Sequence, residues 1–156
     1  MEALYRAEIR EGSVGEVRQL LRTRNRREDG LGLPLPGGPV AVFEPFGDAL
    51  VLSGEGSLPD RAVGEDVEIK LSEASQVIVT SEEIASDGRS QTIRLTVRNA
   101  RPVAVKFEAR IAVGSAAKIT AVPPQKLTRK DGRYLMTTEI QPNSITLLTY
   151  RMVKSD

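Results

Sequence analysis

The sequence predicts an all-β protein in two parts, an N-terminal antiparallel β subdomain over residues 1–72 and a β-sandwich over residues 73–156. Apolar and polar residues alternate with a period of two, which is the period of a β-strand. Turn signals recur roughly every 8–12 residues, as is typical of sandwiches. Gly and Pro are dense in residues 30–64, whereas residues 66–156 are denser in strand patterns, and this shift suggests the division near residue 72.

The clearest alternation runs from Val103 to Val113. The even-numbered positions carry Lys106, Glu108 and Arg110 and predict the solvent face of a strand. Phe107 lies midway along the opposite, all-apolar face, so we predict that it is a core residue. That face consists of Val103, Val105, Phe107, Ala109, Ile111 and Val113.

Other stretches repeat the pattern and are separated by turn chemistry. Asp87-Gly88 and Asp131-Gly132 supply the positive φ angles that a tight hairpin needs. Leu148, Tyr150 and Met152 fall on one face of a predicted terminal strand. Further strands are predicted around residues 40–42, 50–52, 67–71 and 93–97, and further turns at residues 45–48, 99–102 and 141–143.

Residues 17–24 fit two patterns. Val17, Leu20, Leu21 and Arg24 have helical spacing, and the preceding residues 13–16 match a helix capping box. The same residues also alternate as in a strand, and periodicity alone does not decide. The glycines at positions 12 and 15 would weaken a first helical turn, and nothing apolar follows Leu21. We therefore predict a strand, joined to a preceding strand over residues 4–10 by a hairpin turn.

Composition narrows the classes of ligand. Aromatic residues make up 4% of the chain, and Trp is absent, so the core must consist mainly of Val, Leu, Ile and Ala. An exposed aromatic platform for sugars or single-stranded nucleic acid is therefore not expected. The net charge of +1 provides no overall field that attracts polyanions, and we predict no nucleic-acid partner.

The chain contains neither Cys nor His. This excludes disulfides, thiolate nucleophiles, Ser-His-Asp triads and metal sites built from either residue. We predict no metal, no organic cofactor, no catalytic residues and no enzymatic activity. No apolar run reaches the length of a membrane span, and Met1–Leu4 lack the features of a secretion signal. The absence of Cys leaves the compartment open.

The segment Leu33-Pro34-Leu35-Pro36, followed by Gly37-Gly38, is predicted to be structural. Each proline fixes φ and removes an N–H donor, so another strand cannot pair readily with this segment. A proline-rich recognition ligand is the alternative, but such ligands present exposed faces. We expect Leu33 and Leu35 to be buried, which favours a stiff entry into the strand at Val40.

The order of motifs in residues 22–71 resembles the DUF4139 domain, the C-terminal part of bacterial proteins often labelled mucoidy-inhibitor-like. The similar motifs are Arg24-Asn25, the stretch from Gly32 to Phe43, Gly54-Glu55-Gly56-Ser57-Leu58, and Gly64 to Leu71. Residues 92–99 and 142–152 are similar to the second half of that domain. The resemblance implies that the sandwich is immunoglobulin-like, that the chain is part of a larger bacterial protein, and that its location is periplasmic or envelope-associated. It implies no catalytic residues.

Three short patterns resemble known sites. Residues 115–118 match S-x-x-K, but they follow one predicted strand and precede another, which indicates a turn. Glu82-Glu83 with Asp87 suggests paired carboxylates, for which a solvated hairpin end is the simpler interpretation. Residues 54–57 are rich in glycine but lack the Lys and the helix of a phosphate loop.

The densest basic stretch lies around the predicted strand 17–24. On a strand, Arg18, Arg22 and Arg24 share one side and form a candidate patch for an anionic ligand. The alternative is a solvent-facing strand whose arginines form surface ion pairs with Glu8, Glu16, Glu28 or Asp29.

We predict a non-catalytic binding or structural module whose partner is a protein or a cell-surface polymer. A module that assembles copies of itself through an edge strand is the first alternative. A hydrolase that uses carboxylates alone is the second.

Overall fold

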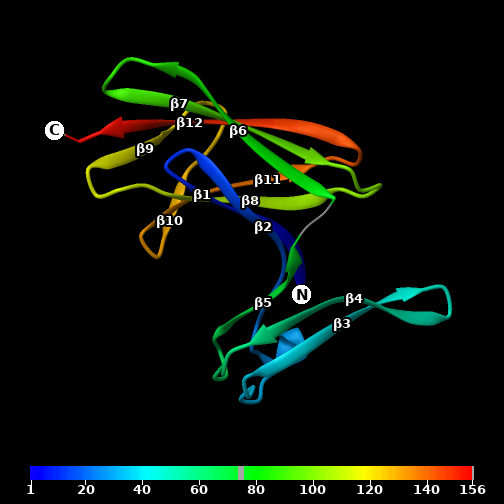
Figure 1. The fold of residues 1–156 in the computed structure, drawn as a ribbon. Coiled ribbons are helices and arrows are strands. Elements are labelled where there is room, and N and C mark those ends of the chain that lie inside the picture. Colours follow the sequence, from blue (N-terminus) through cyan, green and yellow to red (C-terminus); the bar gives the residue numbers. More distant parts are fainter. Residues whose placement is uncertain (74–75, 156) are drawn as a thin grey trace. The chain divides into compact units, whose positions relative to one another are not determined.

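The computed structural model describes residues 1–73 and 76–155, and its regular elements in these ranges are twelve strands and one 3-10 turn, η1 (Arg27–Asp29) (Figure 1). The prediction of an all-β protein is confirmed. The strands are β1 (Glu2–Arg10), β2 (Ser13–Arg24), β3 (Gly38–Phe46), β4 (Ala49–Leu58), β5 (Asp66–Glu73), β6 (Val77–Ser86), β7 (Ser90–Asn99), β8 (Val105–Ala112), β9 (Ala117–Ala121), β10 (Thr128–Lys130), β11 (Arg133–Ile140) and β12 (Ser144–Lys154).

The strands form a mixed eight-stranded sheet and an antiparallel four-stranded sheet. Their orders are β10-β11-β8-β1-β2-β5-β4-β3 and β6-β7-β12-β9. The chain divides into two compact units. The first contains Met1–Leu4 and Arg18–Glu73, and the second contains Tyr5–Val17 and the described residues after Glu73. The chain therefore passes from one unit to the other close to the division near residue 72, and Tyr5–Val17 belongs to the second unit.

The second unit has one core, to which strands of both sheets contribute. Phe107 is fully buried, as are Ala109 and Ile111, so the predicted core face of this strand is confirmed at its centre. Leu148, Tyr150 and Met152 are also buried, as predicted.

The predicted extent of the 103–113 strand was wrong at both ends, because β8 begins at Val105 and ends at Ala112. Val103 is 50% exposed and lies in the loop before β8. Its carbonyl accepts a hydrogen bond from the Asn99 side chain, which holds residues 99–103 in a turn instead of a strand.

The strand prediction for residues 17–24 is confirmed, because all of them lie in β2. The preceding turn contains Glu11 (φ 48°) and Gly12 (φ 81°), so the hairpin explanation of the glycine is also correct. Residues 13–16, which match a capping box, instead lie at the start of β2, whose neighbour in the sheet is β1.

Two buried asparagines close strand ends. Nδ2 of Asn25 donates to the carbonyls of Leu33 (2.8 Å) and Ala62 (3.0 Å), and its Oδ1 accepts from the Gly32 N–H. Nδ2 of Asn99 donates to the carbonyls of Val103 (2.8 Å) and Gln141 (3.0 Å). Each asparagine therefore forms hydrogen bonds with backbone groups of loop residues, which the hydrogen bonds between paired strands do not satisfy.

We expect Asn99→Ala to destabilise the second unit by about 3 kcal/mol. The substitution removes the donor to several carbonyls in a fully buried position, and a buried polar group without a partner costs about 1–3 kcal/mol. Urea unfolding followed by circular dichroism measures the effect. Gln141→Ala serves as the control, because its side chain is exposed. Equal stability of the two variants would contradict this role for Asn99.

The first unit has a small core of Val67, Ile69 and Leu71, against which Leu35 and Val42 pack. The expectation that Leu33 is buried was wrong, since its side chain is 75% exposed. The Asn25 side-chain amide donates a hydrogen bond to the Leu33 carbonyl and so fixes the backbone at this residue, while the Leu33 side chain faces solvent.

Candidate functional site

The three arginines of the candidate anionic-ligand patch lie on β2, opposite acidic residues of β5. In the register of these strands, Arg22 is opposite Glu68 and Arg24 is opposite Asp66. Arg22 Nη2 lies 2.9 Å from Glu68 Oε1, and Arg24 Nε lies 3.2 Å from Asp66 Oδ1. Two of the predicted patch residues therefore form ion pairs, as in the alternative, but these partners belong to β5 and are not among the carboxylates that the sequence suggested.

Arg18 is half-buried and lies opposite Glu73 in the backbone register. Leu20, which stands between Arg18 and Arg22 in the strand alternation, is buried. The patch is therefore interrupted, and an anionic ligand on this side would compete with Glu68 and Asp66. Binding at this patch stays a prediction.

The carboxylates near the β6–β7 turn have structural contacts. Glu82 pairs with Arg94 at 3.0 Å, and Glu83 accepts from Gln91 at 2.6 Å. Hydrogen bonds from the Ser90 N–H, the Ser90 hydroxyl and the Arg89 N–H lower the pKa of the Asp87 carboxyl. A general acid needs a raised pKa, so these contacts do not prepare Asp87 for that role.

The other two sequence motifs also have structural explanations. Residues 115–116 form a turn, closed by a hydrogen bond from Ala117 N–H to the Gly114 carbonyl, and β9 follows directly. The turn interpretation of S-x-x-K is confirmed. Gly56 lies against the backbone of β5, where an added Cβ would stand 2.0 Å from the Lys70 carbonyl oxygen. Close packing of two strands explains this glycine.

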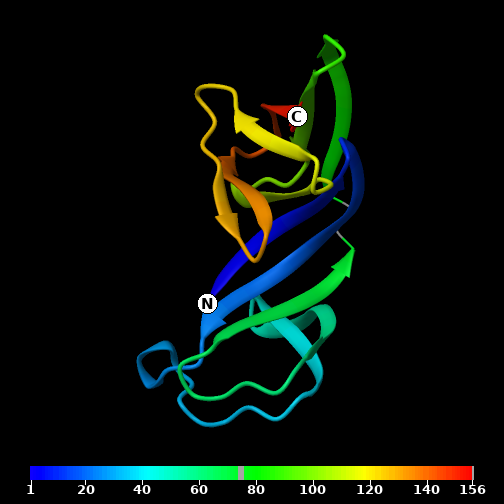
Figure 2. The same ribbon diagram turned by 90° about the vertical axis from the view of Figure 1, so that its left-hand side faces the viewer.

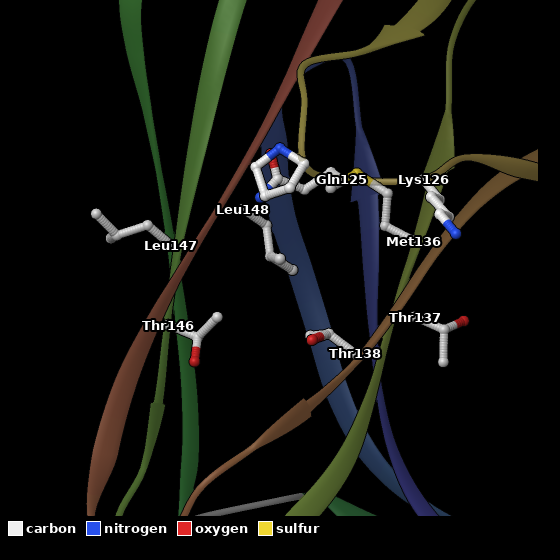
Figure 3. A pocket seen from close by; sticks show the side chains of 9 residues that line it. Gln125, Lys126, Met136, Thr137, Thr138, Thr146, Leu147 and Leu148 are labelled. Carbon is white, nitrogen blue, oxygen red and sulfur yellow. The ribbon is translucent and has the colours of Figure 1, made fainter.

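A groove opens inside the second unit, beside β11 and β12. Its cavity volume is about 450 Å³, and it is lined by Pro124, Gln125, Lys126, Met136, Thr137, Thr138, Thr146, Leu147 and Leu148. Figure 3 shows Thr138 and Thr146 directed into the cavity from opposite strands, whereas Leu147 and Thr137 point away. Met136 and Leu148 are buried and provide an apolar floor, and Lys126 is exposed at the rim.

The groove lies where two short strands end. β9 pairs with β12 at Tyr150–Lys154, and β10 pairs with β11 at Arg133–Leu135. Beyond these positions the chain continues through residues 122–127, seen in yellow between β9 and the orange β10–β11 hairpin in Figure 2. The shortness of β9 and β10 therefore leaves part of each longer strand without a neighbour on one side.

These two half-edges are residues 144–149 of β12 and residues 136–139 of β11. Each is paired on its other side, with β7 and β8 respectively. In the described part of the chain, no strand pairs with either half-edge on the groove side, and residues 122–127 make no backbone hydrogen bond to them. Their outward N–H and C=O groups therefore have no strand partner on this side in the described structure.

The sequence did not reveal this groove. Thr138, Thr146, Met136 and Leu148 belong to ordinary alternating strands, and nothing in their types indicates a cavity. The one available signal was the lack of a long alternating stretch between Val113 and Arg133.

Tyr150 is a buried titratable residue in the core of the second unit. The Tyr150 hydroxyl has no hydrogen-bond partner among the described residues. Burial raises the pKa of this hydroxyl, and the Glu11 carboxylate adds to the effect, so Tyr150 stays neutral. A neutral hydroxyl enclosed by the core has no access to a substrate.

Comparison with known proteins adds no assignment. No family model matches the chain, and no curated protein or solved structure matches it. Among residues 1–73 and 76–155, no helix has the length and apolar character needed to span a membrane.

Proposed function

We propose that this chain is a non-catalytic binding module that holds an extended segment of a partner protein in the groove between β11 and β12. The two half-edges beside the cavity carry this proposal. A strand that pairs with one of them would satisfy main-chain groups that otherwise bind water. This mode of recognition, in which a peptide adds a strand to a sheet, is used by several classes of binding domain.

The side chains of the groove support a peptide ligand. A volume of about 450 Å³ lies within the usual range of ligand sites, and it accommodates a few side chains of an extended chain. Met136 and Leu148 favour apolar residues at alternate ligand positions, since alternate residues of a strand face the same side. Lys126 favours an acidic residue near the rim.

The finer assignments also belong to this proposal. We infer that the second unit is an immunoglobulin-like sandwich and that the chain is related to DUF4139 domains. The packing of two sheets around one core is consistent with the first inference. The order of motifs from Arg24 to Leu71 supports the second.

A library of random linear dodecapeptides displayed on phage tests the proposed function. We expect enriched peptides with alternating apolar residues, and at least tenfold weaker binding of these peptides to Thr138→Trp, which fills the groove. Hydrogen exchange at residues 144–149 should slow when the peptide binds, because a paired amide is protected.

Thr80→Trp is the matched control. Thr80 is an exposed threonine of β6 and lies outside the groove lining and both half-edges. Its binding should equal that of the unmodified chain. Peptides that bind Thr138→Trp as well as the unmodified chain would contradict the groove assignment, and so would a library with no enriched sequence.

A further inference from the structure

The distal part of the β3–β4 hairpin, residues 41–55, is called here the arm. Figure 1 shows it as a two-stranded ribbon that continues beyond β5. The chain contains three phenylalanines, and two of them lie on the arm and are exposed, Phe46 by 80%. Leu50 (70% exposed), Val51 and Leu52 add to this apolar surface. An exposed patch of large apolar residues marks an interaction surface.

Apolar residues lie on both faces of the arm. Phe43 is opposite Leu52 on one face, and the next pair, Glu44 and Val51, lies on the other. Phe46, opposite Ala49, shares the face of Val51. The face that carries Leu50 and Leu52 can therefore enter a groove while the face of Phe46 and Val51 stays outside it.

The β4 side of the arm can donate a strand. β4 pairs with β5 at Ser57, opposite Lys70, and this is the one paired position between these strands in the described structure. Residues 49–55 contain no proline and have β3 on one side only. The β3 side is less suited, because Pro39 and Pro45 lack the N–H that an added strand would need.

The arm is acidic, whereas the one charged residue that lines the groove, Lys126, is basic. Residues 41–55 contain three acidic residues and no Lys or Arg. The second unit holds 15 Lys and Arg against 10 Asp and Glu, an excess of five positive charges. Lys126 at the rim has no ion-pair partner among the described residues, and Arg129 and Lys130 follow it in the chain. Opposite charges favour association of this arm with this groove.

From these observations we propose that the partner is a second copy of this chain. The β4 edge of the arm pairs with the half-edge of β12 in the second copy, and Leu50 and Leu52 enter the groove above Met136 and Leu148. This inference rests on the proposed function, since it names the segment that the groove receives. Because the arm and the groove are different surfaces, each added copy presents a new arm, and the contact supports chains or closed rings.

Analytical ultracentrifugation from about 1 to 500 μM tests the inference. We expect self-association that strengthens with concentration and weakens with added salt. The double variant Leu50→Asp/Leu52→Asp should weaken association at least tenfold, and so should Thr138→Trp. Val103→Asp is the control, because Val103 is an equally exposed apolar residue elsewhere, and it should leave association unchanged.

Mixing the two variants provides a sharper test. The arm variant retains its groove, and Thr138→Trp retains its arm, so an equimolar mixture should form a 1:1 complex although neither forms one alone. This complementation also shows that both variants are folded. Formation of higher species in the mixture would contradict a single arm-to-groove contact.

Several outcomes would overturn the inference. A chain that stays monomeric at all concentrations would overturn it. If this monomeric chain still bound the phage peptides, the proposed function would remain supported. Association lost in the arm variant but retained in Thr138→Trp would place the arm on another surface. Co-sedimentation of the unmodified chain, but not of the arm variant, with phosphatidylcholine vesicles would assign the arm to a lipid surface instead.

Discussion

Glu108→Ala is expected to destabilise the second unit by about 3–5 kcal/mol, although Glu108 stands on the face of β8 that the sequence pattern assigns to solvent. Glu108 and Arg6 are both buried, and Arg6 Nε donates to Glu108 Oε1 at 2.6 Å. Removal of the carboxylate would leave the guanidinium buried without this counter-charge. Chemical denaturation followed by circular dichroism measures the loss.

Two further variants distinguish the destabilisation caused by breaking the Arg6–Glu108 pair from the net contribution of the intact pair to stability. The double replacement Arg6→Met/Glu108→Leu should recover most of the lost stability, because an apolar pair of similar size needs no desolvation of charge. Glu82→Ala, which breaks the exposed pair with Arg94, should cost about 1 kcal/mol or less. Equal effects of Glu82→Ala and Glu108→Ala would show that burial of the pair is unimportant.

Phe107→Ala is expected to cost about 3–5 kcal/mol through the cavity that it leaves. Phe107 is fully buried and lies opposite Thr138 in the β8–β11 register, within the core that both sheets share. The free energy of unfolding in denaturant checks this value. A change of less than about 1 kcal/mol would mean that the core can collapse around the missing ring.

Phe46→Ala provides the matched control for Phe107→Ala. It removes the same ring from a position that is 80% exposed, so it should change stability by about 0.5 kcal/mol or less in dilute, unassociated protein. The difference between the two variants then measures burial and not the loss of an aromatic residue as such.

The local parts of this fold are predictable from the sequence. The alternation of apolar and polar residues identifies the buried centre of β8 and the core face of β12. This period of two residues follows from the backbone geometry of a strand alone. Asp131 and Gly132 both have positive φ, 52° and 74°, as the hairpin turn requires. For residues 17–24, the glycines at positions 12 and 15 and the lack of apolar residues after Leu21 favour a strand over a helix.

The errors arise where a distant residue decides the outcome. Val103 continues the alternation of β8, yet the Asn99 side chain holds it in a turn. Glu108 continues the polar face of the alternation. It is nevertheless buried, because it pairs with Arg6, which lies 102 positions away in the chain. Neither contact leaves a signal in the local pattern.

The candidate sites show the same limit more strongly. The arginine patch was proposed from one strand, and the acidic residues that face it belong to β5, more than 40 positions away. The groove depends on where β9 and β10 end, which is a property of the assembled sheets. The arm could be recognised in part, since a hairpin rich in Leu, Val and Phe without Lys or Arg is unusual for a solvated strand pair.

The two buried asparagines also govern how the protein ages. Deamidation begins when the following backbone nitrogen attacks the side-chain amide carbon and expels ammonia, a step that needs freedom of the side chain and backbone. Water then opens the cyclic imide that has formed. The chain contains three asparagines, and the hydrogen bonds of Asn25 and Asn99 hold two of them fixed inside the protein. The third, Asn143, is exposed in the turn before β12 and is followed by Ser144. Chemical damage to asparagine is thereby directed to a surface turn, while the amides that close the strand ends are spared.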